Sequence, residues 1–515
     1  MSQKSVSEIY SDLNKLKWNV TFKGIIVGLF AGFIVALYRM GIEYATEKSI
    51  DIYRFLKVNP IYIVGWILII VCIGVFISYL VKVSPDSKGS GIPQVESVLL
   101  YGRKMKSFLI IPVRFLAGIL SAFFGVSLGR EGPSIQIGAC GGDIIASKLS
   151  KNKLEENYLI TAGASAGLSA AFNAPLSGII FSLEEVHRSF SPNILIAATT
   201  AALTADVVSK VIFGLKPVLS YVDVSQFPLT QYFWLIPLGI ISGLVGVLVQ
   251  KLLLGSGRVY AKLPPVFRPI IALLIALPFG LFLPQVLGGG QNLVQLSETA
   301  QMSIGVLCLM LVCKMIFTTT SFGSGIPGGI FMPILSMGAL LGSLIAQLGF
   351  HFGVSPDMVS VFCICTMAGV MAASVKAPIT SILLMVEMTG SLVHLLPVAS
   401  VAFIALLTSD LLKTSPIYEM LLERLIDPIL SHTKKKDKVI LEMVVELGSE
   451  VAGNQIKDIQ WPEGLLIVGI RRGDKEFVPN GDFKILQGDY LIILSSEHEY
   501  QIINTQINQL CKPTM

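Results

Sequence analysis

Two stretches of the sequence decide the fold, GREGPSIQIGACGG at 129–142 and GIFMPILSMGALLG at 329–342. The positions identical in both copies recur at an offset of 200, at Gly129, Pro133, Gly138, Ala139 and Gly142. The third position of each copy differs in chemical kind, since Glu131 in the first copy corresponds to Phe331 in the second. A repeated segment broken by Gly and Pro, with an ionisable group in only one copy, is typical of a transporter core built from two related halves.

The composition indicates a membrane protein. Of the 515 residues, 53% are hydrophobic and only 14% are charged, whereas a soluble protein carries about 25% charged residues. Between residues 23 and 430 there are about ten apolar stretches, and each is close to the roughly 20 residues that a spanning helix requires. Clear examples are 61–80, 232–254, 268–287 and 392–412.

The two ends of the chain carry the signals of orientation. The segment 1–22 resembles an amphipathic helix and lacks the continuous apolar core of a cleavable signal. Lysines flank the first and the last apolar stretch, at Lys4, Lys15, Lys17, Lys434, Lys435, Lys436 and Lys438. This distribution predicts that both termini are cytoplasmic. The net charge of +5 reflects the same bias and does not indicate a nucleic-acid-binding surface.

The cysteines and histidines do not suggest a metal centre or a cofactor. Seven cysteines are scattered through mostly apolar sequence. Cys363 and Cys365 could be metal ligands, but no His or carboxylate lies near them in the sequence, so buried free thiols are the favoured interpretation. None of the five histidines has a partner at ligand spacing. We therefore expect no metal, no cofactor and no enzymatic activity.

A second pair of segments repeats at almost the same offset. AFNAPLSGIIFSLEEV at 171–186 matches SVKAPITSILLMVEMT at 374–389, with an offset of 203. The shared positions are Ala174/Ala377, Pro175/Pro378, Ile179/Ile382 and Glu184/Glu387. Two blocks at nearly one offset predict two pseudo-symmetric halves with an ion site between them.

The broken segments offer an anion site without a basic side chain. A helix that begins at a break presents free N–H groups and the positive end of its dipole. Such breaks occur in GSGIP (89–93), with the Ser90 hydroxyl as a further donor, in GREGP (129–133) and in GGIFMP (328–333), which offers the amides of Gly329, Ile330 and Phe331. Any single break could be an ordinary packing feature. Broken backbone inside a membrane must, however, be buried in protein or line a wet cavity, so we expect these three breaks and a fourth, FNAPL (172–176), to converge.

Glu131 has a specific meaning at an anion site. A deprotonated carboxylate can occupy the position of the permeant anion, and a protonated carboxylate carries a proton away from it. Ionisable groups inside membranes are costly and mark functional sites. The alternative is a carboxylate paired with Arg130, and the apolar counterpart Phe331 argues against it.

The second repeat block contains two further carboxylates. Glu184 has a twin in Glu387, which favours a structural, hydrogen-bonded pair. Glu185 corresponds to Met388 and has no twin, so it is the better candidate for a second proton site. A cytoplasmic helix end with surface salt bridges would explain EEVHR (184–188) equally well.

After residue 430 the character of the sequence changes. SHTKKKDK (431–438) is a charged linker, and from 439 short strand-like segments alternate with turns. Asn480–Gly481 and the QGD at 487–489 are hairpin signals, and 496–510 resembles a closing helix. The boundaries predicted are an amphipathic segment (1–22), a transmembrane domain (23–430, with repeats at 23–213 and 232–412), the linker (431–438) and a small α+β domain (439–512).

The motifs of residues 20–425 resemble the CLC family of chloride channels and proton-coupled chloride exchangers. The matching motifs are GSGIPQ (89–94), GREGP (129–133), GGIFMP (328–333) and the tyrosine of SPIY (415–418). The resemblance implies an all-α multi-pass membrane protein made of an antiparallel inverted repeat of short tilted helices. It also implies a homodimer with one anion pathway in each subunit.

The resemblance assigns roles to individual residues. Ser90 and Tyr418 would coordinate chloride together with the amides of Ile330 and Phe331. Glu131 would be the external gating glutamate, and Glu185 the internal proton-transfer glutamate found in exchangers. Ser90 suggests chloride, because a proline there would suggest nitrate.

The C-terminal segment resembles the TrkA-C (RCK-C) domain of potassium-transport regulators, through LGSEVAGNQIKDI and the strand-rich sequence after it. Such domains dimerise and bind small effectors, including cyclic di-AMP. On this resemblance Ile470, Arg471, Arg472 and Pro479 would line a ligand groove. A module that only stabilises a dimer is the alternative.

The sequence thus predicts a chloride/proton antiporter of the cell membrane with a regulatory cytoplasmic domain. The nearest alternative is a passive chloride channel. A membrane-embedded enzyme is disfavoured because no nucleophile, metal set or nucleotide loop is present, and a sensor whose membrane part is a receptor is a third possibility.

Overall fold

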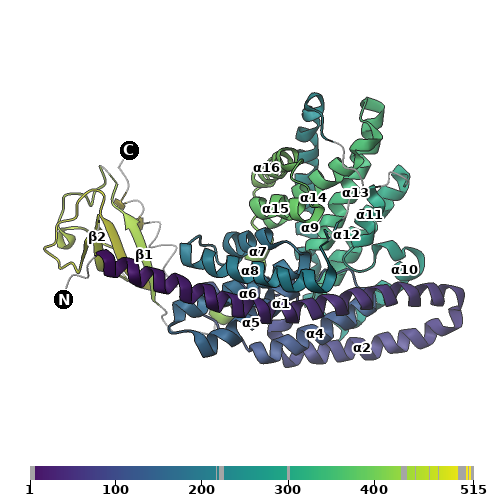
Figure 1. Ribbon diagram of the computed structural model, residues 1–515, viewed down its shortest axis with the longest axis horizontal. Helices are drawn as coiled ribbons and strands as arrows, with labels where there is room; N and C mark the ends of the chain where they lie inside the picture. The colour runs from purple at the N-terminus through teal and green to yellow at the C-terminus, as the bar shows by residue number, and fades with distance from the viewer. Residues whose placement is uncertain are drawn as a thin grey trace. The chain divides into compact units, whose positions relative to one another are not determined.

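The computed structural model describes residues 6–511 apart from 216, 220–225, 299–301, 431–437, 447, 463, 474, 497–505 and 508–509. The chain forms two compact units, Met1–Leu425 and Ile426–Met515. The first is helical and the second contains a β-sheet (Figure 1). Each unit has hydrophobic clusters of its own.

The helical unit contains elements of unequal length. Its helices are α1 (Val6–Val58), α2 (Ile63–Val83), α3 (Ile92–Tyr101), α4 (Ser107–Phe123), α5 (Glu131–Leu149), α6 (Lys153–Phe172), α7 (Pro175–Phe181), α8 (Pro192–Phe213), α9 (Leu235–Ala261), α10 (Phe267–Phe282), α11 (Gln291–Glu298), α12 (Ile304–Gly323), α13 (Phe331–Gly349), α14 (Val359–Val375), α15 (Pro378–Thr389), α16 (Leu395–Leu411) and α17 (Ile417–Leu430). Short 3-10 turns join several of them, and one π-helical turn, η3 (Ser182–Val186), follows α7.

Seven helical segments in the described part of the chain are long and apolar enough to cross a membrane, and four apolar helices are shorter. The number of apolar helices in the described chain thus agrees with the expectation of about ten, but four of them are shorter than the roughly 20 residues expected. One boundary was wrong. The segment 1–22 does not form a separate amphipathic helix, because α1 continues without a break from Val6 to Val58. The apolar sequence after residue 23 extends the helix that the polar segment begins.

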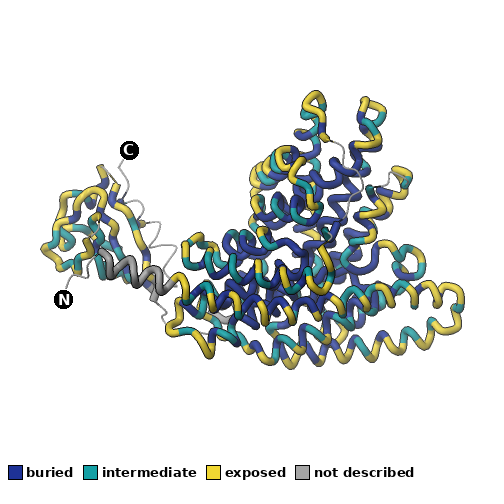
Figure 2. Tube along the Cα trace, viewed as in Figure 1, coloured by how far each residue is buried: buried dark blue, intermediate teal, exposed yellow. Residues whose placement is uncertain are grey.

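The two repeat copies form equivalent helices. α5 and α13 both have 19 residues and begin at the third position of the repeat, at Glu131 and Phe331. α5 packs on α6, and its counterpart α13 packs on α14. All four are largely dark blue in Figure 2, in contrast to the exposed outer face of α2.

The repeated glycines explain how closely these helices pack. A side chain at Gly138 or Gly142 would collide with the backbone of α6, at Gly163 and Leu159. The equivalent Gly338 and Gly342 meet the backbone of α14 in the same way. Small residues let two helix backbones approach inside a membrane protein, where dispersion contacts rather than the hydrophobic effect hold helices together.

The second unit is built on a four-stranded antiparallel sheet in the order β1-β4-β2-β3, formed by β1 (Lys438–Val444), β2 (Leu465–Arg472), β3 (Lys475–Phe477) and β4 (Tyr490–Ser496). The prediction of a small strand-rich domain is confirmed. A turn does occur at Asn480–Gly481, where the amide of Phe483 donates to the carbonyl oxygen of Asn480 at 3.0 Å. The hairpin expected there was wrong, because β4 inserts between β1 and β2 and does not pair with β3. Most of the expected linker and of the closing helix lies outside the described residues.

Candidate functional site

The two copies of the repeat meet at their first glycine. The amide of Gly129 donates to the carbonyl oxygen of Gly329 at 2.8 Å, and the amide of Gly329 donates back to Gly129 at 2.7 Å. This antiparallel bridge lies two positions before the start of α5 and of α13, so it holds two helix N-termini together. Each N-terminus presents unsatisfied amides and the positive end of a helix dipole.

The GSGIP segment joins the same place. The amide of Gly89 donates to Gly325 at 3.2 Å, and the amide of Gly328 donates to Gly89 at 3.1 Å. Gly91 has a left-handed backbone, with φ of 99°, immediately before the start of α3. Such a conformation favours glycine because a side chain would be strained there. The expected convergence is therefore confirmed for these three broken segments.

The Glu131 side chain lies at the junction of the two N-termini. It is fully buried, and its carboxylate oxygens have no hydrogen-bond partner among the described residues. The backbone amides that act on it electrostatically include those of Glu131 and Arg130 at the start of α5 and that of Met332 at the start of α13. A side chain on Gly129 or on Gly329 would collide with its Oε2. The carboxylate thus occupies a cradle that only glycines leave open.

Arg130 does not pair with Glu131. Its guanidinium donates to Glu43 on α1 at 2.6 Å, and Glu43 also accepts a hydrogen bond from Arg39 at 3.0 Å. The alternative of a Glu131–Arg130 pair is therefore excluded in this structure, and sequence reasoning gave no indication of Glu43.

Aromatic rings enclose the side of the site that Tyr418 occupies. The ring of Phe331 lies 6.0 Å from that of Tyr418 and 5.2 Å from that of Phe181, centroid to centroid. Tyr418 is fully buried and interacts with Ser90, and it is close enough to Glu131 and Glu185 to interact electrostatically. The predicted residues Ser90, Ile330, Phe331 and Tyr418 are thus buried around one place.

Arg114 supports the GSGIP segment, and sequence reasoning missed it. This fully buried guanidinium on α4 donates to the carbonyl oxygens of Gly89 at 2.7 Å and Ser90 at 3.1 Å, and to Gln136 on α5. A basic residue inside an apolar segment is a functional signal in membrane proteins, and this signal was available in 107–123.

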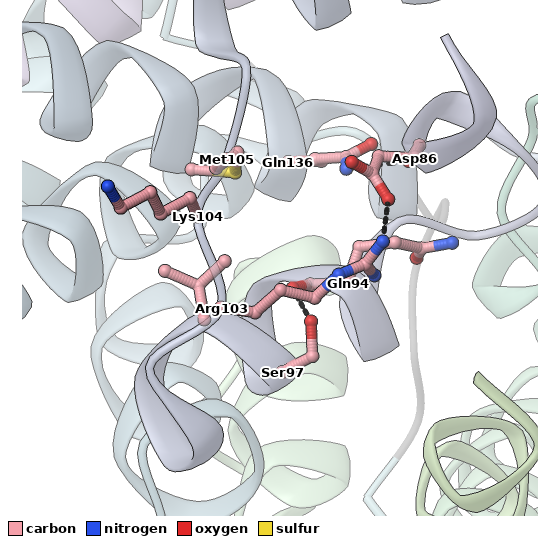
Figure 3. A pocket seen from close by; sticks show the side chains of 8 residues that line it. Asp86, Gln94, Ser97, Arg103, Lys104, Met105 and Gln136 are labelled. Carbon is pink, nitrogen blue, oxygen red and sulfur yellow. Dashed lines mark hydrogen bonds and ion pairs between the residues drawn. The ribbon is translucent and has the colours of Figure 1, made fainter. Parts of the chain in front are cut away.

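A small pocket adjoins this support (Figure 3). Gln136, the partner of Arg114, forms part of its lining. Arg103 crosses the pocket to reach Asp86 at 2.7 Å, and Ser97 donates to the carbonyl oxygen of Gln94 at 2.6 Å. The Asp86–Arg103 ion pair thus joins the segment before GSGIP to the end of α3.

Glu184 and Glu387 form reciprocal helix caps. Glu184 accepts hydrogen bonds from the amide of Thr380 at 3.0 Å and from its hydroxyl at 2.7 Å, at the N-terminus of α15. Glu387 accepts from the amide of Ser177 at 2.7 Å and from its hydroxyl at 2.6 Å, at the N-terminus of α7. The prediction of a structural, hydrogen-bonded pair retained in both halves is confirmed.

Glu185 lies on the π-helical turn η3, separate from these caps. Its side chain is buried, and Oε1 has no hydrogen-bond partner within the described residues. Glu96 on α3 interacts electrostatically with it and is also fully buried. Sequence reasoning missed Glu96, although a carboxylate two positions beyond GSGIPQ was visible.

The C-terminal residues proposed for a ligand groove have different surroundings. Ile470 is fully buried in the core of its own unit, so its side chain does not face a surface groove. Arg472 forms a bidentate pair with the buried Asp489 at 2.7 and 2.8 Å, which raises the pKa of Arg472 above its usual value. Arg471 stacks on the Tyr490 ring, and Pro479 is partly exposed.

No group of three His, Cys, Asp or Glu side chains that could hold a metal ion occurs among the described residues. All seven cysteines are free, and Cys140, Cys363, Cys365 and Cys511 are buried. The interpretation of Cys363 and Cys365 as buried thiols is confirmed.

Comparisons with known proteins agree with this geometry. The family model described as voltage gated chloride channel matches residues 73–410. The chain belongs to this family, the CLC family. A TrkA-C domain model matches residues 440–502. The H(+)/Cl(-) exchange transporter ClcA of Vibrio parahaemolyticus serotype O3:K6 is a CLC relative 32% identical over 444 residues, covering 82% of this chain and 91% of the relative.

Solved CLC structures share the fold. A slow cyanobacterial Cl⁻/H⁺ antiporter superposes with a TM-score of 0.74 and 28% identity, over 81% of this chain and 99% of that chain. A CLC-type fluoride/proton antiporter superposes with a TM-score of 0.63 and 24% identity, over 79% of this chain and 97% of that chain. The second likeness shows the fold alone.

Proposed function

We propose that this CLC protein is a secondary active transporter that exchanges chloride for protons across the membrane. The observation that carries the proposal is the position of the Glu131 carboxylate, unpaired among the described residues and buried between two helix N-termini. The relatives named above are exchangers, which favours exchange over a passive chloride channel.

The anion would bind where the paired N-termini and the two hydroxyls converge. In our proposal the amides of Ile330 and Phe331, next to Gly329, face the chloride, and the hydroxyls of Ser90 and Tyr418 donate to it. Partial charges of this kind hold an anion without the full attraction of a lysine, so the anion can leave. In support, the Ser90 and Tyr418 hydroxyls are both buried and lie next to each other at this place.

Glu131 would couple the two ions by alternating between two states. Ionised, its carboxylate competes with chloride for the N-termini of α5 and α13. The protonated Glu131 side chain carries no charge, so its attraction to these N-termini falls. It then moves out of the site, and an anion can bind there. Glu185 would pass protons between Glu131 and the cytoplasmic side. Its burial without a full set of hydrogen bonds in the described structure supports this role.

The remaining organisation follows the same proposal. The first repeat of the transmembrane domain would begin within α1 and end at 213, and the second would span 232–412. A linker at 431–437 would lead into a regulatory domain that begins with β1 at Lys438 and extends to 512. Both termini would be cytoplasmic, and two copies of the chain would form a homodimer in the cell membrane with one pathway in each.

The C-terminal domain would bind a small effector, for which cyclic di-AMP is the candidate. Arg471 and Pro479 are partly exposed. Arg471 pairs with Glu442 at 3.1 Å, and Arg472 is engaged by the buried Asp489. Equilibrium binding of labelled cyclic di-AMP to the purified full-length protein tests this, with Arg471→Ala as the altered surface. If cyclic di-AMP does not bind saturably, the alternative is that the C-terminal domain only stabilises a dimer.

Flux in reconstituted vesicles tests the transport proposal. An imposed chloride gradient is expected to drive protons uphill, and an imposed pH gradient is expected to drive chloride. A reversal potential set by chloride alone, insensitive to the pH gradient, would instead establish a passive channel.

A further inference from the structure

A group of three carboxylates surrounds one guanidinium beside the proposed anion site. The carboxylates are Glu96 on α3, Glu185 on η3 and Glu419 on α17. Arg188 Nη1 lies 3.3 Å from Glu419 Oε1, and its Nη2 lies 3.8 Å from Glu96 Oε2. Three segments that are distant in the sequence thus contribute to one charged cluster.

The cluster extends from the interior to the surface. The Glu96 side chain is fully buried and the Glu185 residue is 5% exposed, whereas the side chains of Arg188 and Glu419 are 31% and 39% exposed. Neither carboxylate oxygen of Glu96 has a hydrogen-bond partner in the described structure. A proton on Glu419 would therefore be in contact with water, and a proton on Glu96 would not.

The position of Arg188 is fixed by the backbone. Its φ of 54° is left-handed, which is unusual for a residue with a side chain. Its Nε donates to the carbonyl oxygen of Glu185 at 3.3 Å. Because the guanidinium is a planar fork, this bond leaves one arm for Glu419 and the other for Glu96.

The charges of the cluster do not balance when all its members are ionised. Three carboxylates and one guanidinium in the described cluster would sum to a net charge of −2. An uncompensated charge inside a membrane protein is costly, and neighbouring carboxylates that cannot all ionise share protons as a group. Glu96 and Glu185 are the buried members, so they are expected to hold these protons.

The other titratable groups around the cluster are already engaged or neutral. Glu184 caps α15, and His187 shares a hydrogen bond with the Thr161 hydroxyl at 2.7 Å. Tyr418 faces Glu96 and Glu185 from α17. These contacts leave Arg188 as the positive charge that, within the described structure, acts on both buried carboxylates.

We propose that Glu96 and Glu185 form a two-carboxylate proton-binding pair. Arg188 interacts both with this pair and with the water-exposed Glu419, and its position between them sets how readily the pair takes up protons. This inference rests on the proposed function in assigning Glu185 to proton transfer. Glu96 is a second proton-binding residue, and Arg188 and Glu419 are positioning residues. Without the Glu419 charge, the Arg188 guanidinium attracts only the buried pair. This stronger attraction favours the ionised form of the pair.

The test compares the pH dependence of chloride-driven proton flux in vesicles. Glu419→Gln is expected to shift the midpoint of the proton-flux profile by about one pH unit toward acid, because the pair then binds protons only at higher proton concentration. Glu419→Asp retains the charge and is expected to retain the profile. Glu423→Gln, one turn further along α17 at an exposed position, is the matched control and is expected to leave the profile unchanged.

A second measurement is independent of transport. Infrared titration of the purified protein in lipid records protonated carboxyl groups, and Glu96→Gln is expected to remove one such group and to shift the titration of the remaining one toward acid. Proton flux in the wild type, combined with unshifted profiles in Glu419→Gln and an unchanged infrared signal in Glu96→Gln, would overturn the inference alone. An infrared signal that behaves as expected in a wild type without coupled flux would support the pair and reject the proposed function.

Discussion

Gly129 and Gly329 exchange two backbone hydrogen bonds, of 2.8 and 2.7 Å, although they lie in different halves of the chain. These glycines occupy the same position in the two repeat copies, so a sequence symmetry becomes a physical contact at the centre of the membrane unit. The Glu131 carboxylate lies against both of them. The contact therefore determines where the one carboxylate of the repeat can lie.

Substitution of Gly129 is expected to displace Glu131. The nearest atoms to a new Cβ at Gly129 all belong to the Glu131 side chain, and the backbone there is not left-handed. We expect Gly129→Ala to fold, to conduct chloride and to lose most proton coupling, because the carboxylate no longer fits at the N-termini. Vesicle flux of both ions measures the effect.

Two comparisons make this result specific. Gly305→Ala, in the first turn of α12, has no atom near its new Cβ and should behave as the wild type. The double variant Gly129→Ala/Glu131→Ala should match Glu131→Ala, since two changes acting through one side chain are not additive. Additive losses would show that Gly129→Ala damages the backbone instead.

Removal of the Glu131 carboxylate is expected to separate the two ion movements. Glu131→Ala should abolish proton transport while chloride flux persists, because the N-termini remain but their competing charge is gone. Fluorescent pH recording and chloride-electrode measurements on the same vesicles test it. Persistent chloride-driven proton movement in this variant contradicts the role assigned to Glu131.

The neighbouring Glu184 and Glu185 are expected to respond differently. Glu185→Gln should block proton transport alone. Glu184→Gln weakens a helix cap and should lower the stability of the membrane unit by about 1 kcal/mol, with both fluxes falling together. Thermal unfolding measured alongside flux distinguishes them, and Glu387→Gln should reproduce the behaviour of Glu184→Gln.

Arg114 is expected to set chloride affinity through the GSGIP backbone. Arg114→Met leaves the carbonyl oxygen of Ser90 without its guanidinium donor and that of Gly89 with the Gly328 amide alone. Such a loss costs about 1–3 kcal/mol of stability. We expect chloride binding to weaken roughly tenfold, as measured by calorimetry. Arg268→Met is the control, because Arg268 also donates to two backbone carbonyls, those of Leu263 and Ala261, which lie outside the three broken segments. Equal losses in both variants would indicate general destabilisation.

The Arg472–Asp489 pair is expected to hold the C-terminal unit together. Asp489 is fully buried, and Asp489→Asn removes the charge that Arg472 contacts. Because the side-chain amide nitrogen of the new, buried Asn would face N–H donors of Arg472 or Leu486 where Asp489 has an acceptor oxygen, the stability of this unit should fall by roughly 1–3 kcal/mol.

The thiol of Cys511 reports on this loss. Burial raises the pKa of the Cys511 thiol to about 11, so the thiol is mostly protonated and shielded at neutral pH. Maleimide labelling of Cys511, followed by peptide mass spectrometry of the full-length protein, should be slow in the wild type and faster in Asp489→Asn. Equal labelling rates would show that the pair does not stabilise this unit.

Internal repetition made much of the site predictable. The offset of 200 identified the two breaks, GREGP and GGIFMP, at which α5 and α13 begin, and the offset of 203 separated Glu184 from Glu185. Both inferences came from comparing the first copy of a repeated segment with the second copy. The aromatic contact between Phe331 and Tyr418 was not visible in this way, because Tyr418 lies outside both repeats.

The residues that were missed lack this internal comparison. Glu43, Glu96 and Arg114 obtain their meaning from partners on other helices, which sequence spacing does not reveal. The same limit explains the wrong hairpin at Asn480–Gly481. The residues of a turn determine a local bend, whereas the insertion of β4 between β1 and β2 is determined by tertiary packing.

The reciprocal caps of Glu184 and Glu387 have a consequence for how the chain is made. Each glutamate completes a helix of the opposite half, so neither half alone could satisfy its own buried backbone. A polypeptide cut between Phe213 and Leu229 would keep both caps, and the two fragments should assemble when produced together. Either fragment produced alone should be degraded. The two halves of the continuous chain are therefore expected to depend on each other for folding.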